Sequence, residues 1–131
     1  MRFLLDTNAV IAVLNDPKGP VSRRLRRHPP ADIGVSAIVM HELYFGAFKS
    51  QRQAHNLGIV DSLRFEVLTF DLEDARHAGE IRAALAARGT PIGGYDVLIA
   101  GQARARGLTL VSHNLREFTR VSGLTIVDWT A

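Results

Sequence analysis

Near its amino terminus the chain reads Arg2-Phe3-Leu4-Leu5-Asp6-Thr7-Asn8, a short apolar run that ends at an aspartate. A run of this length, bounded by polar residues, predicts a buried β-strand over Arg2–Leu5 that leads directly into a loop. In open α/β sheets the loops at the carboxyl ends of the strands are where ligands bind. Asp6 is therefore the first candidate for a functional residue.

Strand-like runs recur along the chain, and segments with helical spacing lie between them. The further runs are Ile33–Ser36, Phe65–Leu68, Thr109–Ser112 and Leu124–Val127. This alternation predicts a mostly parallel central sheet flanked by helices. A chain of 131 residues is long enough to bury one core of this kind. We therefore expect a single α/β domain over residues 1–131.

Polar residues at the ends of the runs predict where the helices begin. Thr7 is expected to cap the first helix, and Ser36 a helix that carries Glu42. Asp71 is expected to cap a later helix that ends at Gly89, where a glycine supplies the left-handed exit. The segment 114–117, which reads Asn-Leu-Arg-Glu, has the spacing of a capping box, with asparagine in place of serine or threonine.

The composition excludes several classes of protein. Hydrophobic residues make up 47% of the chain and charged residues 22%, which is typical of a globular domain. Cysteine is absent, so disulfides, thiolate zinc sites and a cysteine nucleophile are excluded. No apolar run approaches the length of a membrane span, and no basic, apolar leader precedes the first strand. We expect a cytoplasmic protein that does not contact membranes.

Three carboxylates, Asp6, Glu42 and Asp96, follow the strands or begin the helices at one end of the predicted sheet. Right-handed connections would bring them to the same edge. Hard oxygen ligands select Mg²⁺ or Mn²⁺, so we expect these three residues to hold such an ion. Asn114 follows the fourth strand, and we expect it to act at this site as a neutral ligand or to orient water.

Each candidate also has a structural interpretation. An aspartate after a strand is most often a helix cap, which applies to Asp6 and Asp96 taken singly. Glu42 is harder to explain in this way, because it lies on a largely apolar helix where an unpaired charge is costly to bury. Ser112 could hydrogen-bond a carboxylate, as could Thr7, and His113 could touch substrate or be a loop histidine without a function.

The net charge is +3, and only one stretch concentrates basic residues, Arg23-Arg24-Leu25-Arg26-Arg27. Four guanidinium groups on so short a segment cannot all be buried. We expect Arg23 and Arg27 to lie near the mouth beside Asp6 and to contact the phosphates of a polyanion. The alternative is that the cluster binds acidic side chains of a protein partner or of a second subunit, since arginine is also favoured at protein interfaces.

Four strings in order along nearly the whole chain resemble the PIN-domain ribonucleases, specifically the VapC-type toxins of bacterial toxin–antitoxin modules. The strings are Leu4–Asn8, 36–47 around Glu42, 91–100 around Asp96, and 110–118 around Asn114. The resemblance implies an α/β/α domain, Mg²⁺- or Mn²⁺-dependent endoribonuclease activity, homodimerisation, and a VapB-type antitoxin through which operator DNA is bound.

The resemblance also implies roles for individual residues. Asp6, Glu42 and Asp96 would be the metal-site carboxylates, and a metal-activated water would hydrolyse the phosphodiester. Many members of the family have a fourth acidic residue where this chain has Asn114. A complete set of four carboxylates, and a second metal ion, are therefore not expected from the motif alone.

Two other functions are compatible with part of the sequence. Leu4–Asn8 is similar to the nucleophile motif of haloacid-dehalogenase-like phosphatases, whose second aspartate would be Asn8 here. A non-catalytic nucleic-acid-binding module would account for the arginines, but it leaves Glu42 and Asp96 without a role.

Overall fold

A computed structural model describes all residues, 1–131. Its centre is a five-stranded sheet in the order β3-β2-β1-β4-β5, with every neighbouring pair parallel. The strands are β1 (Phe3–Leu5), β2 (Ile33–Ser36), β3 (Glu66–Leu68), β4 (Thr109–Val111) and β5 (Ile126–Val127). The expected parallel sheet is confirmed. Each strand except β2 is one or two residues shorter than the run that predicted it.

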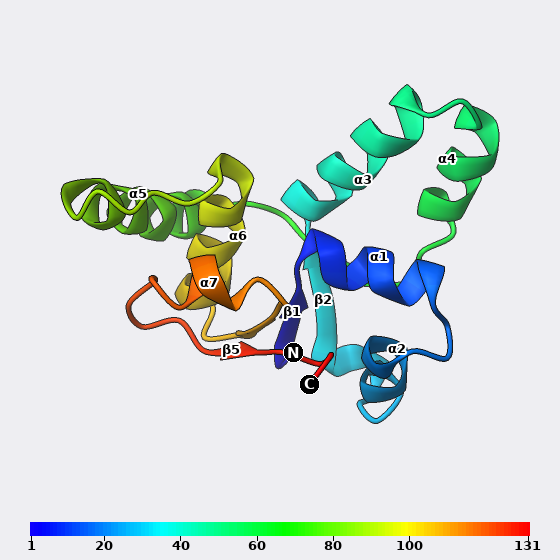
Figure 1. Cartoon of the computed structure of the whole chain (residues 1–131), viewed down its shortest axis with the longest axis horizontal. Coiled ribbons are helices and arrows are strands. Elements are labelled where there is room, and N and C mark those ends of the chain that lie inside the picture. Colours follow the sequence, from blue (N-terminus) through cyan, green and yellow to red (C-terminus); the bar gives the residue numbers. More distant parts are fainter.

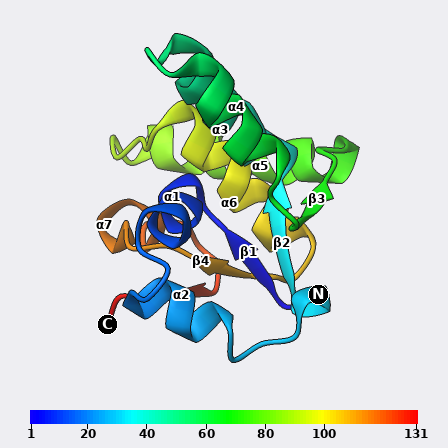
Figure 2. The same cartoon turned by 90° about the vertical axis from the view of Figure 1, so that its right-hand side faces the viewer.

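Helices cover both faces of the sheet, as the alternation of strands and helices predicts (Figures 1 and 2). On one side lie α1 (Thr7–Asn15), α2 (Pro20–Leu25), α3 (Ala37–Lys49) and α4 (Gln53–Asp61). On the other lie α5 (Leu72–Ala87), α6 (Gly94–Ala105) and the short α7 (Leu115–Phe118). A short 3-10 turn, Pro30–Asp32, precedes β2. No helix is long and apolar enough to cross a membrane.

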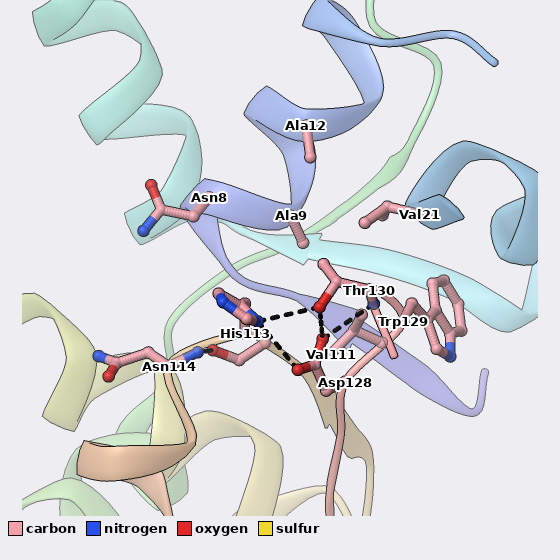
Figure 3. A pocket seen from close by; sticks show the side chains of 11 residues that line it. Asn8, Ala9, Ala12, Val21, Val111, His113, Asn114, Asp128, Trp129 and Thr130 are labelled. Carbon is pink, nitrogen blue, oxygen red and sulfur yellow. Dashed lines mark hydrogen bonds and ion pairs between the residues drawn. The ribbon is translucent and has the colours of Figure 1, made fainter. Parts of the chain in front are cut away.

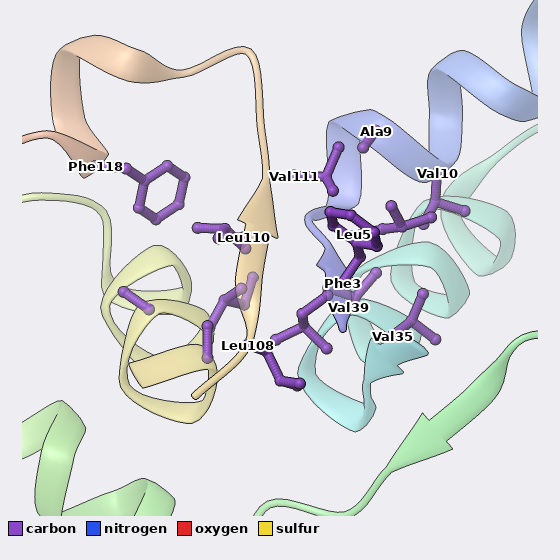
Figure 4. Close-up of a cluster of buried hydrophobic side chains, with 14 of the residues drawn as sticks. Phe3, Leu5, Ala9, Val10, Val35, Val39, Leu108, Leu110, Val111 and Phe118 are labelled. Atoms are coloured by element: carbon purple, nitrogen blue, oxygen red, sulfur yellow. The ribbon is translucent and has the colours of Figure 1, made fainter. Parts of the chain in front are cut away.

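One hydrophobic core joins these layers. Leu5 and Val35 are fully buried in the central strands, beside Val10 of α1 and Val39 of α3 (Figure 4). Phe118 of α7 is buried beside Leu110 of β4. The β1 strand is buried along its whole length because it pairs with β2 on one side and with β4 on the other. The loop after β1 therefore has a rigid base.

The closest contact between helices is that of α5 with α6. A Cβ atom placed on Gly101 would lie 2.6 Å from both the Cβ and the backbone nitrogen of Ala78. Gly101 therefore allows the two helices to approach more closely than any other residue would permit. At the start of α5, Asp71 and Asp74 form a reciprocal capping box, and Gly89 after the helix has φ 67°, so both expected boundaries are confirmed.

Candidate functional site

Asp6 lies at the carboxyl end of β1 and is 4% exposed. Its backbone N–H donates to the carbonyl of Val111 in β4 (3.1 Å), and its Oδ1 accepts from the N–H of Ala9 (2.8 Å). Asp6, and not Thr7 as expected, is thus the cap of α1. Burial raises the pKa of Asp6, and the charge of Glu42 adds to the increase, whereas hydrogen bonds from Ser112 and Ala9 oppose it.

Thr7 does not cap α1, but the alternative expectation, a hydrogen bond to a carboxylate, is confirmed. As the first residue of α1, it donates from Oγ1 to Oε1 of Glu42 at 2.8 Å. Glu42 lies on α3, which begins after Ser36, and the Ser36 side chain accepts from the N–H of Ile38 as expected of a cap. The hydrogen bond therefore fixes the carboxylate of α3 next to the start of α1.

Asp96 lies in the first turn of α6 and is half-buried. Its pKa is raised to about 7, first because burial disfavours the charged form, and then because Glu117 hydrogen-bonds and repels it. The charges of Asp6 and Glu42 raise the same pKa further. Carboxyl groups from four separate segments of the chain therefore act on one another at this edge of the sheet.

Glu117 is the acidic residue that the sequence interpretation missed. It lies on α7, and the Nδ2 of Asn114 donates to its Oε2 at 3.1 Å. Asn114 precedes α7 but makes no side-chain capping bond, so the expected capping box does not form. The three-residue spacing from Asn114 to Glu117 indicates a bond between a side chain and the backbone, whereas in the structure the two side chains bond to each other. Asn114 positions an acid, and Glu117 supplies the fourth carboxylate.

The donor set fits a hard divalent cation in its chemistry. The oxygens of Asp6, Glu42, Asp96 and Glu117 are of the type that Mg²⁺ and Mn²⁺ prefer. The raised pKa of Asp96 reflects burial first and then repulsion by the other carboxylates, which a cation would relieve. As the side chains lie, however, no three His, Cys, Asp or Glu residues are grouped closely enough to hold an ion. A metal would have to draw the carboxylates together.

A cavity of about 440 Å³ lies beside these carboxylates, between α1, α2, the end of β4 and the carboxyl-terminal segment (Figure 3). Ser112 and His113, both expected near the site, are part of its lining. His113 Nδ1 lies 2.9 Å from Oδ2 of Asp128. Although burial alone would raise the pKa of Asp128, hydrogen bonds from Thr130 and His113 hold that pKa below its ordinary value.

The arginine cluster lies on α2 and on the residues directly after it. Helix α2 lies toward the amino-terminal end of β1, at the other end of the sheet from the starts of α3 and α6 (Figures 1 and 2). Arg24 donates to the carbonyl of Ala131 at 3.0 Å, and Arg26 to that of Pro17 at 2.8 Å. Arg23 and Arg27 are exposed. Neither lines the cavity beside Asp6, although Val21 of α2 does, and the contact of Arg23 and Arg27 with RNA stays a prediction.

Comparisons with known proteins agree with this arrangement. The PIN domain family model matches residues 3–124. The chain is 42% identical over 131 residues to the tRNA(fMet)-specific endonuclease VapC of Salmonella typhimurium, and 37% identical over 131 residues to ribonuclease VapC2 of Haemophilus influenzae strain Rd. Each alignment covers 98% of both chains.

Solved structures give the same result. DNA-bound VapBC from Salmonella typhimurium contains a chain that superposes with a TM-score of 0.93 at 42% identity, covering 98% of each chain. VapBC2 from Rickettsia felis, bound to a DNA fragment from its promoter, gives a TM-score of 0.90 at 32% identity, covering 98% of this chain and 99% of that one.

Proposed function

The chain belongs to the PIN domain family and, within it, to the VapC proteins, and from this premise we propose that it is a metal-dependent endoribonuclease and the toxin of a toxin–antitoxin module. The observation that carries the proposal is the electrostatic state of Asp96. Burial first, and then Glu117, Asp6 and Glu42, raise its pKa to about 7, so carboxyl groups from four segments of the chain act on one another at this edge of the sheet.

Mg²⁺ or Mn²⁺ is the proposed cofactor, and when bound it would lower the pKa of a coordinated water and neutralise charge on the phosphoryl group. Asp6 and Asp96 would hold the ion. The carboxylate of Asp6 is held by the N–H of Ala9 and by its buried surroundings, so this side chain would lose little freedom when the ion binds. Glu117 would complete the set from α7.

Glu42 is suited to orient the attacking water, because Thr7 holds one of its oxygens and leaves the other free to accept a proton or a hydrogen bond. Asn114 acts through Glu117, since its amide donates to that carboxylate. No serine or cysteine nucleophile is required in this scheme.

The proposed substrate is RNA. Because the chain is 42% identical to a tRNA(fMet)-specific endonuclease, initiator tRNA is the first candidate. Arg23 and Arg27 would contact its backbone away from the cleaved bond. Replacing both with alanine should flatten the dependence of log KM on log salt by about 0.7 per lost single-strand phosphate contact and leave kcat unchanged. If the arginines instead bind a protein partner, the salt dependence of cleavage stays as in the wild type and antitoxin affinity falls.

Two protein partners are part of the same proposal. A VapB-type antitoxin would inhibit the enzyme and carry it to operator DNA, as both compared structures are VapBC complexes on DNA. A second copy of the chain would pack on α3, where Phe45 is 60% exposed and Phe48 is 58% exposed. The ring of Tyr95 on α6, which is 49% exposed, lies 5.2 Å from the ring of His41 on α3. Side chains of this size are rarely left in water together. The cytoplasm, where RNA is found, is the proposed location.

The phosphatase alternative loses its support. Its general acid would stand at position 8, where the chain has Asn8, an exposed amide that cannot donate a proton as an acid. A protein that only binds nucleic acid does not explain why Glu117, Asp6 and Glu42 are gathered around Asp96, where their charges repel one another.

The proposed activity can be tested in cells. Expression without the antitoxin should stop growth and produce discrete cleavage of initiator tRNA, and Glu42→Gln should abolish both at equal protein level. Co-expression of the product of the neighbouring antitoxin gene should restore growth. Intact initiator tRNA in growth-arrested cells would rule out that substrate, and arrest by the Glu42→Gln protein would rule out the catalytic assignment.

A further inference from the structure

The cavity beside the carboxylates has two kinds of wall. Ala9 and Ala12 of α1 and Val21 of α2 form an apolar wall, and they point into the space opposite the carboxyl-terminal segment (Figure 3). Trp129, in the carboxyl-terminal segment, also lines the cavity; it is 3% exposed, and its ring is stacked on that of His28 at 5.4 Å. A volume of about 440 Å³ lies within the range of small-ligand sites.

The other wall is polar and internally ordered. Thr130 donates from Oγ1 to Oδ1 of Asp128 at 2.6 Å, and His113 Nδ1 lies 2.9 Å from Oδ2 of the same carboxylate. Because Asp128 can only accept, the proton of a neutral His113 is on Nδ1, and Nε2 is left as a free acceptor. The His113 side chain is 75% exposed, so this acceptor is available to a ligand.

The cavity adjoins the carboxylate site. Asn8 and Ala9, which line it, directly follow Asp6 in the chain, and Ser112 and Asn114 line it from the other side. The charge of Asp128 is close enough to raise the pKa of Asp6. A phosphate held near Asp6 would therefore have its attached nucleoside within reach of the cavity.

We propose that this cavity binds one unstacked nucleoside of the substrate, adjacent to the cleaved phosphate, with its base against Ala9, Ala12 and Val21 and its polar edge at His113. The proposal rests on the ribonuclease function and adds a site that selects the nucleotide. A base is a flat, largely apolar body with a hydrogen-bonding edge, and proteins read single-stranded RNA by holding such bases out of the stack. The two walls match those two properties.

The tryptophan provides a direct assay. Trp129 is the only tryptophan of the chain and it lines this cavity, so its fluorescence is the signal for binding there. The four nucleoside 5′-monophosphates are titrated separately into the intact protein in EDTA, where no cleavage takes place. We expect a saturable change in Trp129 fluorescence with at least one nucleotide in the micromolar to millimolar range.

Two substitutions locate the binding. Ala12→Leu fills the apolar side and should weaken the affinity by about tenfold or more. Thr130→Val removes the hydroxyl beside His113 without enlarging the side chain and should weaken it several-fold. Ala105→Leu, on a half-buried alanine at the end of α6 outside the cavity, is the matched control and should bind as the wild type does. Melting temperatures of all variants establish that each is folded.

The proposal is overturned if none of the four nucleotides changes the fluorescence saturably. It is equally overturned if folded Ala12→Leu and Thr130→Val proteins both bind with wild-type affinity. Because no metal or cleavage enters the measurement, this result is independent of the proposed activity. Nucleotide binding without RNA cleavage would reject the ribonuclease function, and cleavage without nucleotide binding would reject only the nucleoside site.

Discussion

Replacing Asp96 with asparagine should stabilise the metal-free protein, and by more at alkaline than at acidic pH. Its pKa in the folded state is raised from the ordinary 3.8 to about 7, by burial first and then by Glu117. The contribution of Asp96 to stability is therefore complete below about pH 4 and is lost as the pH rises through about 7. Asparagine does not titrate, and its amide can still donate to Glu117.

The expected gain in the free energy of unfolding follows from the same pKa values of Asp96. A difference of one in pKa corresponds to about 1.4 kcal/mol, so a change from 3.8 to about 7 sets an upper bound of about 4 kcal/mol. Asp96 is only half-buried, and solvent screens its neighbours, so we expect about 1–2 kcal/mol. In a domain of 131 residues this corresponds to a melting temperature higher by roughly 4–8 °C at alkaline pH.

The assay is thermal unfolding of both proteins in EDTA between about pH 5 and about pH 8.5. Asp16→Asn is the control, since Asp16 is exposed at the end of α1 and lies outside the site. The difference between Asp96→Asn and wild type should grow across this interval, and that between Asp16→Asn and wild type should stay constant. A pH-independent difference for Asp96→Asn would refute the idea that the carboxylates repel one another.

Two further changes test particular contacts. Glu117→Gln should weaken Mn²⁺ binding more than Asn114→Ala does, because Glu117 supplies a negative charge and Asn114 only positions that carboxylate. Calorimetric titration of Mn²⁺ into both variants gives the order of the affinities. The reverse order would show that Asn114 is itself a ligand. Gly101→Ala should cost about 1–3 kcal/mol in urea unfolding, because its methyl group meets Ala78 at 2.6 Å. Gly58→Ala on α4 is the control, because its added methyl group has no atom within 4 Å, and it should stabilise the protein by about 0.5–1 kcal/mol. Equal effects of the two substitutions would contradict the close contact between α5 and α6.

Much of the sheet could be predicted from the sequence because each buried parallel strand is a continuous apolar run. The residues at which the strands begin and end do not follow from these runs alone. Leu124 continues the apolar run before Ile126, yet β5 begins only at Ile126, which pairs with Leu110. Where a strand ends depends on the length of its neighbour, and this is not encoded in the run itself.

The site was predictable in part for a similar reason. Asp6, Glu42 and Asp96 follow from topology, because right-handed connections bring the carboxyl ends of parallel strands to one edge. The direction of a side chain on a short helix does not follow from topology. Asn114 and Glu117 were therefore interpreted as a backbone cap, although they contact each other. For Thr7 the sequence allows either a helix cap or a hydrogen bond to a carboxylate, and the structure shows the second, since its hydroxyl donates to Glu42 on another helix.

The most direct test of the central claim is cleavage of initiator tRNA by the purified protein with Mg²⁺, Mn²⁺ or EDTA, compared with Asp6→Asn. We predict cleavage with either cation, none in EDTA, recovery when excess cation is restored, and no cleavage by a folded Asp6→Asn protein. Cleavage that persists in EDTA, or at the wild-type rate in Asp6→Asn, would contradict the assignment of this carboxylate cluster as a metal-dependent catalytic centre.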